Sequence, residues 1–588
     1  MKGGEYLIAE VACEDIFTPE DFSDEQRQFA ETTEQFVEKE IVPHLEEIEN
    51  QNFDLVVEGM RKCGEIGLLM MDAPEEYGGL ELDKASSMLV AEKISVGGSF
   101  SVAYAAHTGI GTLPLIYYGT DQQKEKYLEK IISGEWCAAY CLTEPGSGSD
   151  ALGAQASAVL SEDGTHYILN GTKQFITNGG FAELFTIFAK IDKEHFTAFL
   201  VEKGFEGLVV GPEEKKLGIK GSSTTQIILD NCKVPVENLL GEAGKGHKIA
   251  FNVLNVGRFK LGAGVTGAAK MALVTGIKYA NERKQFKRKI SSFGAIAEKI
   301  ADLTADLFAS ESLVYRLAGL LDNKLATIEK GIDDYYVEYQ KGIEEYAPEC
   351  GISKVFCSEV LARTVDEVVQ IHGGYGYVSE YPAERYYRDE RINRIFEGTN
   401  EINRLLIPGM ILRKAMKGEL PLQAEAMKAF ESLMTPSFEE LDDSVLFAAE
   451  KELIKNLKTL FLILSGVGVQ KFMDKIADEQ EILMAAADIA IQIFALESTV
   501  LRAEKHFTKA SENRKELLKA AVKVFAFSAT EITGSAAKKG AFYVEEGDTL
   551  TMILSGIRRF AKYDATGLLA AKRLLAKAAC EEEKYIFS

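Results

Sequence analysis

One carboxylate is set apart by its neighbours: Glu397, in the stretch RIFEGTNEINR that runs from Arg394 to Arg404. The apolar pair Ile395-Phe396 precedes it, a Gly-Thr turn follows it, and a helical pattern begins after the turn. An apolar neighbourhood disfavours the charged form of a carboxyl group, raises its pKa and makes its carboxylate a stronger base. A lone Glu in a turn is otherwise most often a solvated surface acid, so this stretch alone leaves both interpretations open.

Two further stretches have the composition of ligand-binding segments. CLTEPGSGSD, residues 141–150, offers backbone N–H groups and hydroxyls, and its glycines let a ligand approach the backbone closely. KQFITNGG, residues 173–180, places Phe175 and Thr177 on one side of a strand, since they are two residues apart. An aromatic ring beside a hydroxyl could flank a planar cofactor, but a surface turn and a core strand are the plain alternatives.

Three other patterns carry weaker signals. GAGVTG, residues 262–267, fits the dinucleotide fingerprint GxGxxG, but that motif needs a preceding strand, and both flanks here are helical, which favours helix packing. ERKQFKRKI, from Glu282, is interpreted as helix and puts Arg283 and Phe286 on one face, where the cations suit a pyrophosphate. QIHGGYGYVSEYP, from Gln370, fits either a close approach to a ligand or a turn that ends a helix.

Composition excludes several classes of function. The chain has 588 residues and a formal net charge of −24, which argues against nucleic-acid binding because phosphate contacts need a basic surface. The charge also disfavours broad contact with an anionic membrane. The most apolar run considered, TLFLILSGVGVQ at 459–470, is too short to span a bilayer, and no signal or transit pattern begins the chain. The eight cysteines form no CxxC pair and no metal-like spacing, so we expect no metal and a reduced, cytoplasmic protein.

The hydrophobic periodicity changes along the chain and indicates an α+β fold that is mainly α. We expect an N-terminal helical domain (1–135), a central β domain (136–245), a C-terminal helical bundle (246–416), a linker (417–440) and an additional helical domain (441–588). Ser23 is the expected N-cap of the first long helix, and Pro43 is expected to break it. Glu162-Asp163-Gly164 is a hairpin turn, and the acidic, Tyr-rich segment 322–349 is interpreted as a solvated insertion.

The order and separation of these motifs are more informative than any one of them. CLTEPGSGSD, KQFITNGG, NVGR, ERKQF, QIHGGYGYVSEYPAERYYRD and RIFEGTNEINRL together closely resemble the acyl-CoA dehydrogenase family. The resemblance covers about Ser23 to Leu412. The helical extension after Pro436 makes the chain resemble the very-long-chain branch, whose members carry an additional C-terminal helical domain.

The resemblance implies a chemistry. Family members bind FAD between the β domain and the C-terminal helical domain, and oxidise an acyl-CoA to the trans-2-enoyl-CoA. Glu397 matches the catalytic base, which removes a proton from the substrate α-carbon while hydride leaves to flavin N5. The implied function is oxidation of long-chain acyl-CoA in fatty acid β-oxidation, with electron-transferring flavoprotein as acceptor. The alternatives are an acyl-CoA oxidase, which gives electrons to oxygen, and a non-catalytic scaffold that has kept the fold.

The same match, made residue by residue, implies binding positions. Those matching flavin contacts are Leu142, Thr143, Gly148, Ser149, Phe175, Thr177, Thr399 and Asn400. Those matching contacts to the FAD adenosine and pyrophosphate across a subunit boundary are Arg283, Phe286, Gln370, Gly373 and Gly374. Those matching substrate contacts are Ser149, Asn255, Arg258 and Gly398.

Two departures and one added segment qualify the resemblance. Many relatives have Trp where this chain has Phe175, and Gly257 stands in the region from which some relatives supply an alternative base, so no second acid competes there. The extended relatives are dimers, which implies a homodimer. The basic, apolar segment 556–577 fits either a peripheral membrane contact or a helix packed on the core or dimer interface, and we favour the packed helix.

Overall fold

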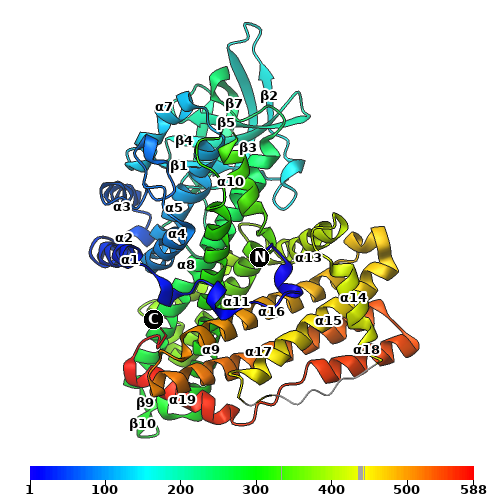
Figure 1. Ribbon diagram of the computed structural model, residues 1–588. Coiled ribbons are helices and arrows are strands. Elements are labelled where there is room, and N and C mark those ends of the chain that lie inside the picture. The colour runs from blue at the N-terminus through cyan, green and yellow to red at the C-terminus, as the bar shows by residue number, and fades with distance from the viewer. Residues whose placement is uncertain (333, 435–441, 443, 588) are drawn as a thin grey trace.

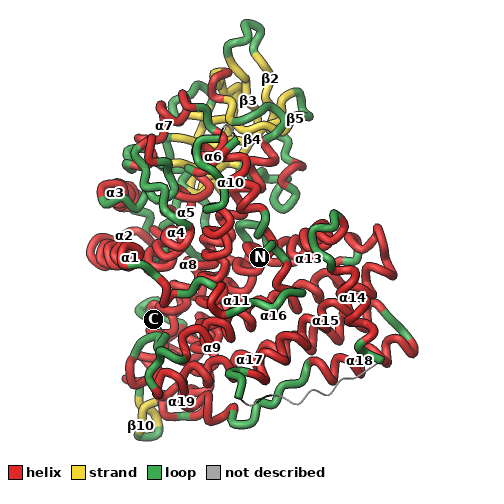
Figure 2. Tube along the Cα trace, in the orientation of Figure 1, coloured by secondary structure: helices red, strands yellow, loops and turns green. Residues whose placement is uncertain are grey.

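The computed structural model describes residues 1–332, 334–434, 442 and 444–587. The strands of the large sheet gather at one end of the molecule, a two-stranded hairpin lies at the opposite end, and long helices run between them (Figures 1 and 2). The α+β, mainly α organisation expected from the sequence is confirmed. The order along the chain is helices, a β sheet, helices and a helical extension.

The N-terminal helices begin and end where local signals predict. The Ser23 hydroxyl caps the first helix by accepting a hydrogen bond from the Gln26 backbone N–H, and the Gln26 side-chain oxygen accepts one from the Ser23 backbone N–H. The α-helical pattern then passes into a π turn at Val37–Ile41 and a 3-10 turn containing Pro43, so the expected break is confirmed. The α-helices of this domain are α1 (Asp24–Phe36), α2 (Leu45–Glu49), α3 (Phe53–Glu65), α4 (Lys84–Ile94), α5 (Ser99–Ala106), α6 (Leu113–Tyr118) and α7 (Asp121–Ile132).

The central domain is built on one mostly antiparallel sheet. Its strands are β1 (Ala138–Cys141), β2 (Ser157–Leu160), β3 (His166–Thr177), β4 (Leu184–Ile191), β5 (His195–Glu202), β6 (Leu208–Glu213), β7 (Thr224–Pro235) and β8 (Leu239–Leu240). They lie in the order β6-β7-β3-β2-β4-β5-β8, and β1 pairs parallel to β4. The β2–β3 hairpin turns at Glu162-Asp163-Gly164, as the sequence predicts.

A bulge in β3 interrupts the alternation expected for Phe175 and Thr177. Between Lys173 and Ile176 the register against β7 shifts, and Phe175 has a left-handed φ of 58°. The Phe175 side chain is 62% exposed, whereas Lys173 is fully buried. A bulge adds a residue and turns the strand, so the regular alternation of sides does not hold from Lys173 to Phe175.

The helices that follow the β domain confirm one sequence interpretation and correct another. GAGVTG lies inside one long helix, as expected for packing glycines. That helix ends at Glu282, so the expectation that Arg283 and Phe286 share a helix face is wrong: Arg283 directly precedes a two-stranded hairpin, and Phe286 lies at the turn of that hairpin. The elements are α8 (Gly246–Glu282), β9 (Lys284–Gln285), β10 (Arg288–Lys289), α9 (Gly294–Leu325), α10 (Tyr335–Glu344), α11 (Ala347–His372), α12 (Pro382–Glu390) and α13 (Asn400–Met416).

The Tyr-rich segment 322–349 is only partly solvated: the described residues between α9 and α10 are mostly exposed, as expected, whereas α10 and the start of α11 are packed. It forms the end of α9, the helix α10 and the start of α11. Tyr339 lies 5.5 Å from the Tyr117 ring of α6, and Ile343 is fully buried. The acidic residues suggest a solvated insertion, but the tyrosines supply an apolar face that covers α6 and α8.

The C-terminal extension is joined to the rest of the chain by buried charges. Arg502 donates to the carboxylates of Glu20 near the N-terminus and Glu311 of α9, and to the Phe587 backbone oxygen at the C-terminal end. The helices are α14 (Leu422–Glu431), α15 (Ala448–Phe472), α16 (Gln480–Phe507), α17 (Glu512–Val544), α18 (Gly547–Phe560) and α19 (Leu568–Glu582). Helix α14 lies within the expected linker and packs on α15, whereas Pro436 lies outside the described residues.

Two further expectations concern apolar segments. Among the described residues, α16 is long and apolar enough to cross a membrane by length and composition, unlike the run at 459–470 in α15. Because 78% of its most apolar window is buried, this is weak evidence for a span and is typical of a core helix. The segment 556–577 spans the end of α18, a loop and the first part of α19, and α19 packs against α9 and α17.

Candidate active site

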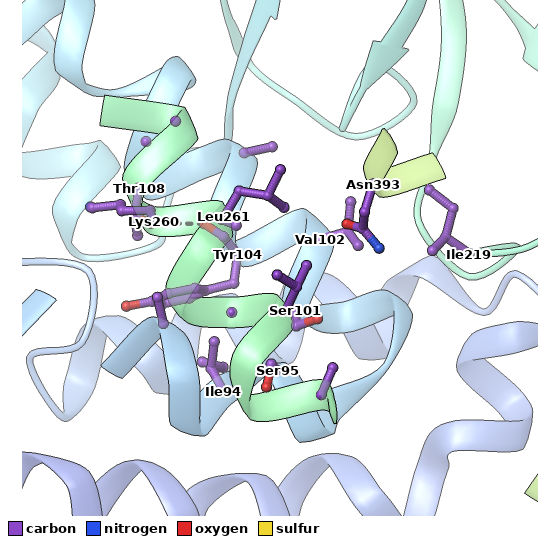
Figure 3. Close-up of a pocket in the computed structure, with 18 of the residues that line it drawn as sticks. Ile94, Ser95, Ser101, Val102, Tyr104, Thr108, Ile219, Lys260, Leu261 and Asn393 are labelled. Atoms are coloured by element: carbon purple, nitrogen blue, oxygen red, sulfur yellow. Dashed lines mark hydrogen bonds between the residues drawn. The ribbon is translucent and has the colours of Figure 1, made fainter. Parts of the chain in front are cut away.

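A deep, mostly apolar cavity lies between the N-terminal helices, α8 and the turn that precedes α13. In Figure 3, Lys260 and Leu261 of α8 lie across from Ser101, Val102 and Tyr104 of α5. Ile219, from the loop before β7, and Asn393, from the turn after α12, lie on the other side of the cavity. Residues of α5, α8, the β domain and the turn after α12 thus line one cavity.

Glu397 lies on this cavity wall in a strained turn. Its φ is 56° and that of Gly398 is 79°, so two consecutive residues are left-handed, which is costly for Glu. Its carboxylate lies against α8 at Gly257, where an added Cβ would stand only 2.4 Å from Glu397 Oε2. Gly257 is therefore the residue that makes room for the carboxylate. Glu397 Oε2 is buried and has no hydrogen-bond partner within the protein.

Side chains of α8 and α13 hold the backbone of this turn by hydrogen bonds. Arg258 of α8 donates to the Glu397 backbone oxygen at 3.4 Å and to Asn255 Oδ1 at 2.8 Å. Asn403 of α13 donates to the backbone oxygens of residues 397, 398 and 399 at 3.3, 2.8 and 3.1 Å. Thr399 accepts from the Ile402 N–H and caps α13. The turn is held mainly through its backbone, which leaves the Glu397 carboxylate free to react.

Burial tunes the Glu397 carboxyl group toward base chemistry near neutral pH. Loss of solvation raises its pKa from 4.5 to about 7, although the positive charges of Arg258 and Lys354 oppose the rise. Burial also lowers the pKa of the Lys354 ammonium to about 7, while Glu397 opposes that change. A carboxylate with a pKa near the working pH is a strong yet still ionised base, which suits removal of a weakly acidic proton.

The glycine-rich loop after β1 is supported by a buried ion pair that the sequence did not single out. Lys173 Nζ lies 2.7 Å from Glu144 Oε1, and the Glu144 carboxylate also accepts from the backbone N–H groups of Gln155 and Ala156. Leu142 is buried behind this pair, whereas Ser149 is exposed. An added Cβ at Gly148 would meet nothing within 4 Å, so this loop offers open backbone. The Gln174 N–H donates to Thr143 O and joins the loop to the bulge that exposes Phe175.

Thr177 lines the main cavity beside Glu397, but a second group of expected ligand residues lies elsewhere. Arg283, Gly373 and Gly374 line a separate pocket at the far end of α8, where Arg283 stacks over the Tyr375 ring at 5.4 Å. The exposed Gln370 precedes this pocket on α11, and Phe286 is 88% exposed on the neighbouring hairpin. Residues 258 and 283 are 25 positions apart on and just past one helix, or about 37 Å at 1.5 Å per residue. One protomer thus presents the two groups far apart.

Asn400 is placed differently from the other expected cofactor contacts. Its side chain is buried against α11, where it accepts from Lys354 Nζ at 2.6 Å and donates to Ser358 and Glu359. Two residues that sequence reasoning missed, Lys354 and Asn403, thus support the turn at Glu397. Their contacts cross between helices, and only the RIFEGTNEINR stretch itself carries a signal for Asn403.

Family models match nearly every part of this architecture. Models described as the N-terminal, middle and C-terminal domains of acyl-CoA dehydrogenase match residues 23–135, 139–232 and 244–411, and another C-terminal domain model matches 456–559. The chain belongs to the acyl-CoA dehydrogenase family. Family membership makes it an enzyme of the FAD-dependent acyl-CoA dehydrogenase class.

Individual relatives extend the match to the C-terminal helices. The chain is 49% identical over 587 residues to a probable acyl-CoA dehydrogenase of Bacillus subtilis, covering 100% of this chain and 98% of that protein. A crystal structure of an acyl-CoA dehydrogenase complexed with FAD from Bacillus anthracis matches with a TM-score of 0.97 and 49% identity over all of both chains. The very long-chain specific acyl-CoA dehydrogenase of Mus musculus is 39% identical over 403 residues, covering 66% of this chain and 58% of that enzyme.

The two sets of residues fit different parts of a flavin dinucleotide in this acyl-CoA dehydrogenase. The open backbone at Gly148 and the exposed ring of Phe175 suit a flat aromatic group. The Arg283 guanidinium and the Gly373-Gly374 backbone, where an added Cβ would meet no atom within 4 Å, suit a pyrophosphate. The residues present therefore fit the cofactor that the family uses.

Proposed function

We propose that this FAD-dependent acyl-CoA dehydrogenase converts long-chain acyl-CoA to trans-2-enoyl-CoA in cytoplasmic fatty acid β-oxidation, with Glu397 as the catalytic base. The observation that carries the proposal is the Glu397 carboxylate on the wall of an apolar cavity, with a buried oxygen that has no partner within the protein. A buried acceptor without a partner is costly, which is expected of a group that meets its partner only when substrate binds.

The protein residues divide the work of the reaction. Glu397 takes the proton from the substrate α-carbon, so that the C–H bond breaks and an O–H bond forms on the carboxylate. Arg258 and Asn403 hold the turn, and the apolar lining excludes water, which keeps the carboxylate basic. FAD, when bound, accepts the hydride that leaves the β-carbon. We propose electron-transferring flavoprotein as the partner that then takes the electrons.

The preference for long acyl chains is supported by the small residues that line the cavity. An added Cβ at Gly109 would meet no atom within 4 Å, and one at Gly264 would meet only Ala91 O at 3.5 Å. Both glycines line the cavity together with Ala105 and Ala106, so space remains where larger side chains would end it. A longer apolar cavity gives more favourable burial to each added methylene of the substrate.

A homodimer is supported by the separation between the cavity at Glu397 and the pocket at Arg283. Because Arg258 and Arg283 are about 37 Å apart along α8, we propose that the pocket at Arg283 serves the FAD whose flavin lies in the partner's cavity. The exposed apolar rings of Phe286 and Tyr377, 88% and 87% exposed, favour burial of this face in an assembly.

The variant Glu397→Gln tests the proposed base directly. It keeps the size of the side chain, so FAD binding and folding should be retained, while anaerobic bleaching of the flavin by a long-chain acyl-CoA should fall by at least about 100-fold. The matched control is Glu401→Gln, which makes the same change on an exposed acid one turn away. Substantial bleaching by Glu397→Gln would remove Glu397 as the base. Rapid peroxide formation in air by the wild-type enzyme would favour the oxidase alternative instead.

A further inference from the structure

Lys354 of α11 lies beneath the turn that carries Glu397 and is fully buried. Its Nζ donates to the Gly398 backbone oxygen at 2.8 Å and to Asn400 Oδ1 at 2.6 Å. We infer that Lys354 is a positioning residue that holds the Glu397–Gly398 turn, and through it the Glu397 carboxylate, in the geometry needed for proton removal. The inference rests on the proposed function of Glu397.

A buried ammonium in this place needs an explanation beyond stability. Among the described residues, no ion pair joins Lys354 to a carboxylate, unlike the buried Lys173, which pairs with Glu144. Burying a cation without a direct ion pair is unfavourable, so an apolar side chain would serve the fold at least as well. The charge lies instead next to the only turn in which Glu and Gly are both left-handed in succession among the described residues.

The hydrogen bonds explain how Lys354 acts on the turn. A left-handed Glu costs about 1–2 kcal/mol, so the conformation persists only where neighbouring groups hold it. Lys354 binds Gly398 O from α11, while Asn403 Nδ2 binds the same oxygen at 2.8 Å from α13. Two donors from two helices thus fix one carbonyl. Loss of the Lys354 donor should let the peptide rotate and move the Glu397 carboxylate away from Gly257.

The charge of Lys354 acts on the same carboxylate. The charged and titratable groups that face Glu397 are Arg258 from α8, Lys354 from α11 and Tyr140 from β1. Those that face Lys354 are Glu397, Arg258, Glu359 and Glu401. When Glu397 takes the substrate proton it becomes neutral, so Lys354 stabilises the carboxylate before the step and not after it. Removing the ammonium should therefore raise the pKa of Glu397 and leave less of the base ionised at neutral pH.

The test is to measure the protonation of Glu397 directly in the FAD-bound enzyme. The carboxyl band of Glu397, identified as the infrared difference between wild type and Glu397→Gln, is titrated with pH in wild type, Lys354→Met and Lys354→Gln. Lys354→Gln keeps amide donors for Gly398 O and Asn400 but removes the charge. We expect both variants to raise the midpoint by about one pH unit, a tenfold change in proton affinity. Anaerobic flavin bleaching at a pH above the midpoint should fall in Lys354→Met and be largely kept in Lys354→Gln.

Lys414→Met is the matched control. Lys414 is also a buried lysine whose ammonium donates to backbone oxygens, those of Gly3 and Glu345; unlike Lys354 it also pairs with the Glu345 carboxylate, and it lies at the other end of α13 from Glu397. The variant Lys414→Met should lower thermal stability without changing the pH midpoint at which Glu397 titrates. An unchanged midpoint and an unchanged bleaching rate in Lys354→Met would overturn the inference. If Lys354→Met does not fold, the midpoint of Lys354→Gln decides. Absence of bleaching by any acyl-CoA in wild type would refute the proposed function, whereas the infrared midpoints would still judge Lys354.

Discussion

The contact between Gly257 and Glu397 allows a sharp prediction for Gly257→Ala. An added Cβ would stand 2.4 Å from Glu397 Oε2, 2.7 Å from Cδ and 3.0 Å from Oε1. Since ordinary van der Waals contact begins near 3.4 Å, the carboxylate must retreat by about 1 Å. A misplacement of about 1 Å at a reacting group costs about 100-fold in rate, which corresponds to about 2.7 kcal/mol of activation free energy.

The fold should survive the same substitution. The methyl group meets the end of a flexible side chain rather than backbone, and Ala is favoured over Gly inside a helix by about 0.5–1 kcal/mol. We therefore expect unchanged or slightly higher thermal stability, retained FAD and an approximately 100-fold slower flavin bleaching in anaerobic stopped flow. Gly409→Ala is the matched control, since its Cβ would meet nothing within 4 Å inside α13. Bleaching by Gly257→Ala within about threefold of wild type would refute the assigned position of the base.

Two further predictions concern buried charges. Burial raises the pKa of Glu349 from 4.5 to about 7, so ionisation of this carboxyl group lowers the free energy of unfolding as pH rises from 5 to 7. Glu349→Gln removes this cost, so it should stabilise the protein at pH 8 by at most about 3 kcal/mol and hardly change its stability at pH 5. Equal shifts of the thermal midpoint at both pH values would contradict this. Asp72 pairs with both Lys84 and Lys260 at 2.5 Å, so Asp72→Asn should leave two buried cations without a counter-charge and destabilise the protein by about 3–5 kcal/mol. An unchanged thermal midpoint would show that the two ammonium groups do not depend on Asp72.

Much of the fold follows from local signals, and the exceptions have local causes. The capping box at Ser23 and the hairpin turn at residues 162–164 are readable because neighbours in sequence supply both partners. The hairpin that follows Arg283 and turns at Phe286 cannot be predicted in this way, because its residues continue a helical pattern although the backbone φ becomes left-handed at Phe286. The tyrosines of α10 mislead in another way, because an amphipathic helix is recognised only once its covering partner is known.

In the candidate site, too, some features could be predicted from the sequence and others could not. The RIFEGTNEINR stretch predicts a carboxylate in an apolar setting, and the structure places Glu397 there. The stretch carries no sign that Gly257 makes room for the carboxylate or that Lys354 lies beneath the turn, because both come from helices more than 40 residues away in the chain. Sequence spacing reports neighbours along one element, whereas these contacts depend on how α8 and α11 pack against each other.

The central claim is tested most directly by the visible spectrum of the FAD-bound enzyme under anaerobic conditions, titrated with saturated acyl-CoAs of increasing chain length. We expect the oxidised flavin band to be bleached, and long-chain substrates to bleach it at lower concentration than short ones because the cavity buries more of their methylenes. A flavin spectrum that no saturated acyl-CoA changes would contradict the assigned reaction. Bleaching by short chains alone would contradict the assigned substrate class.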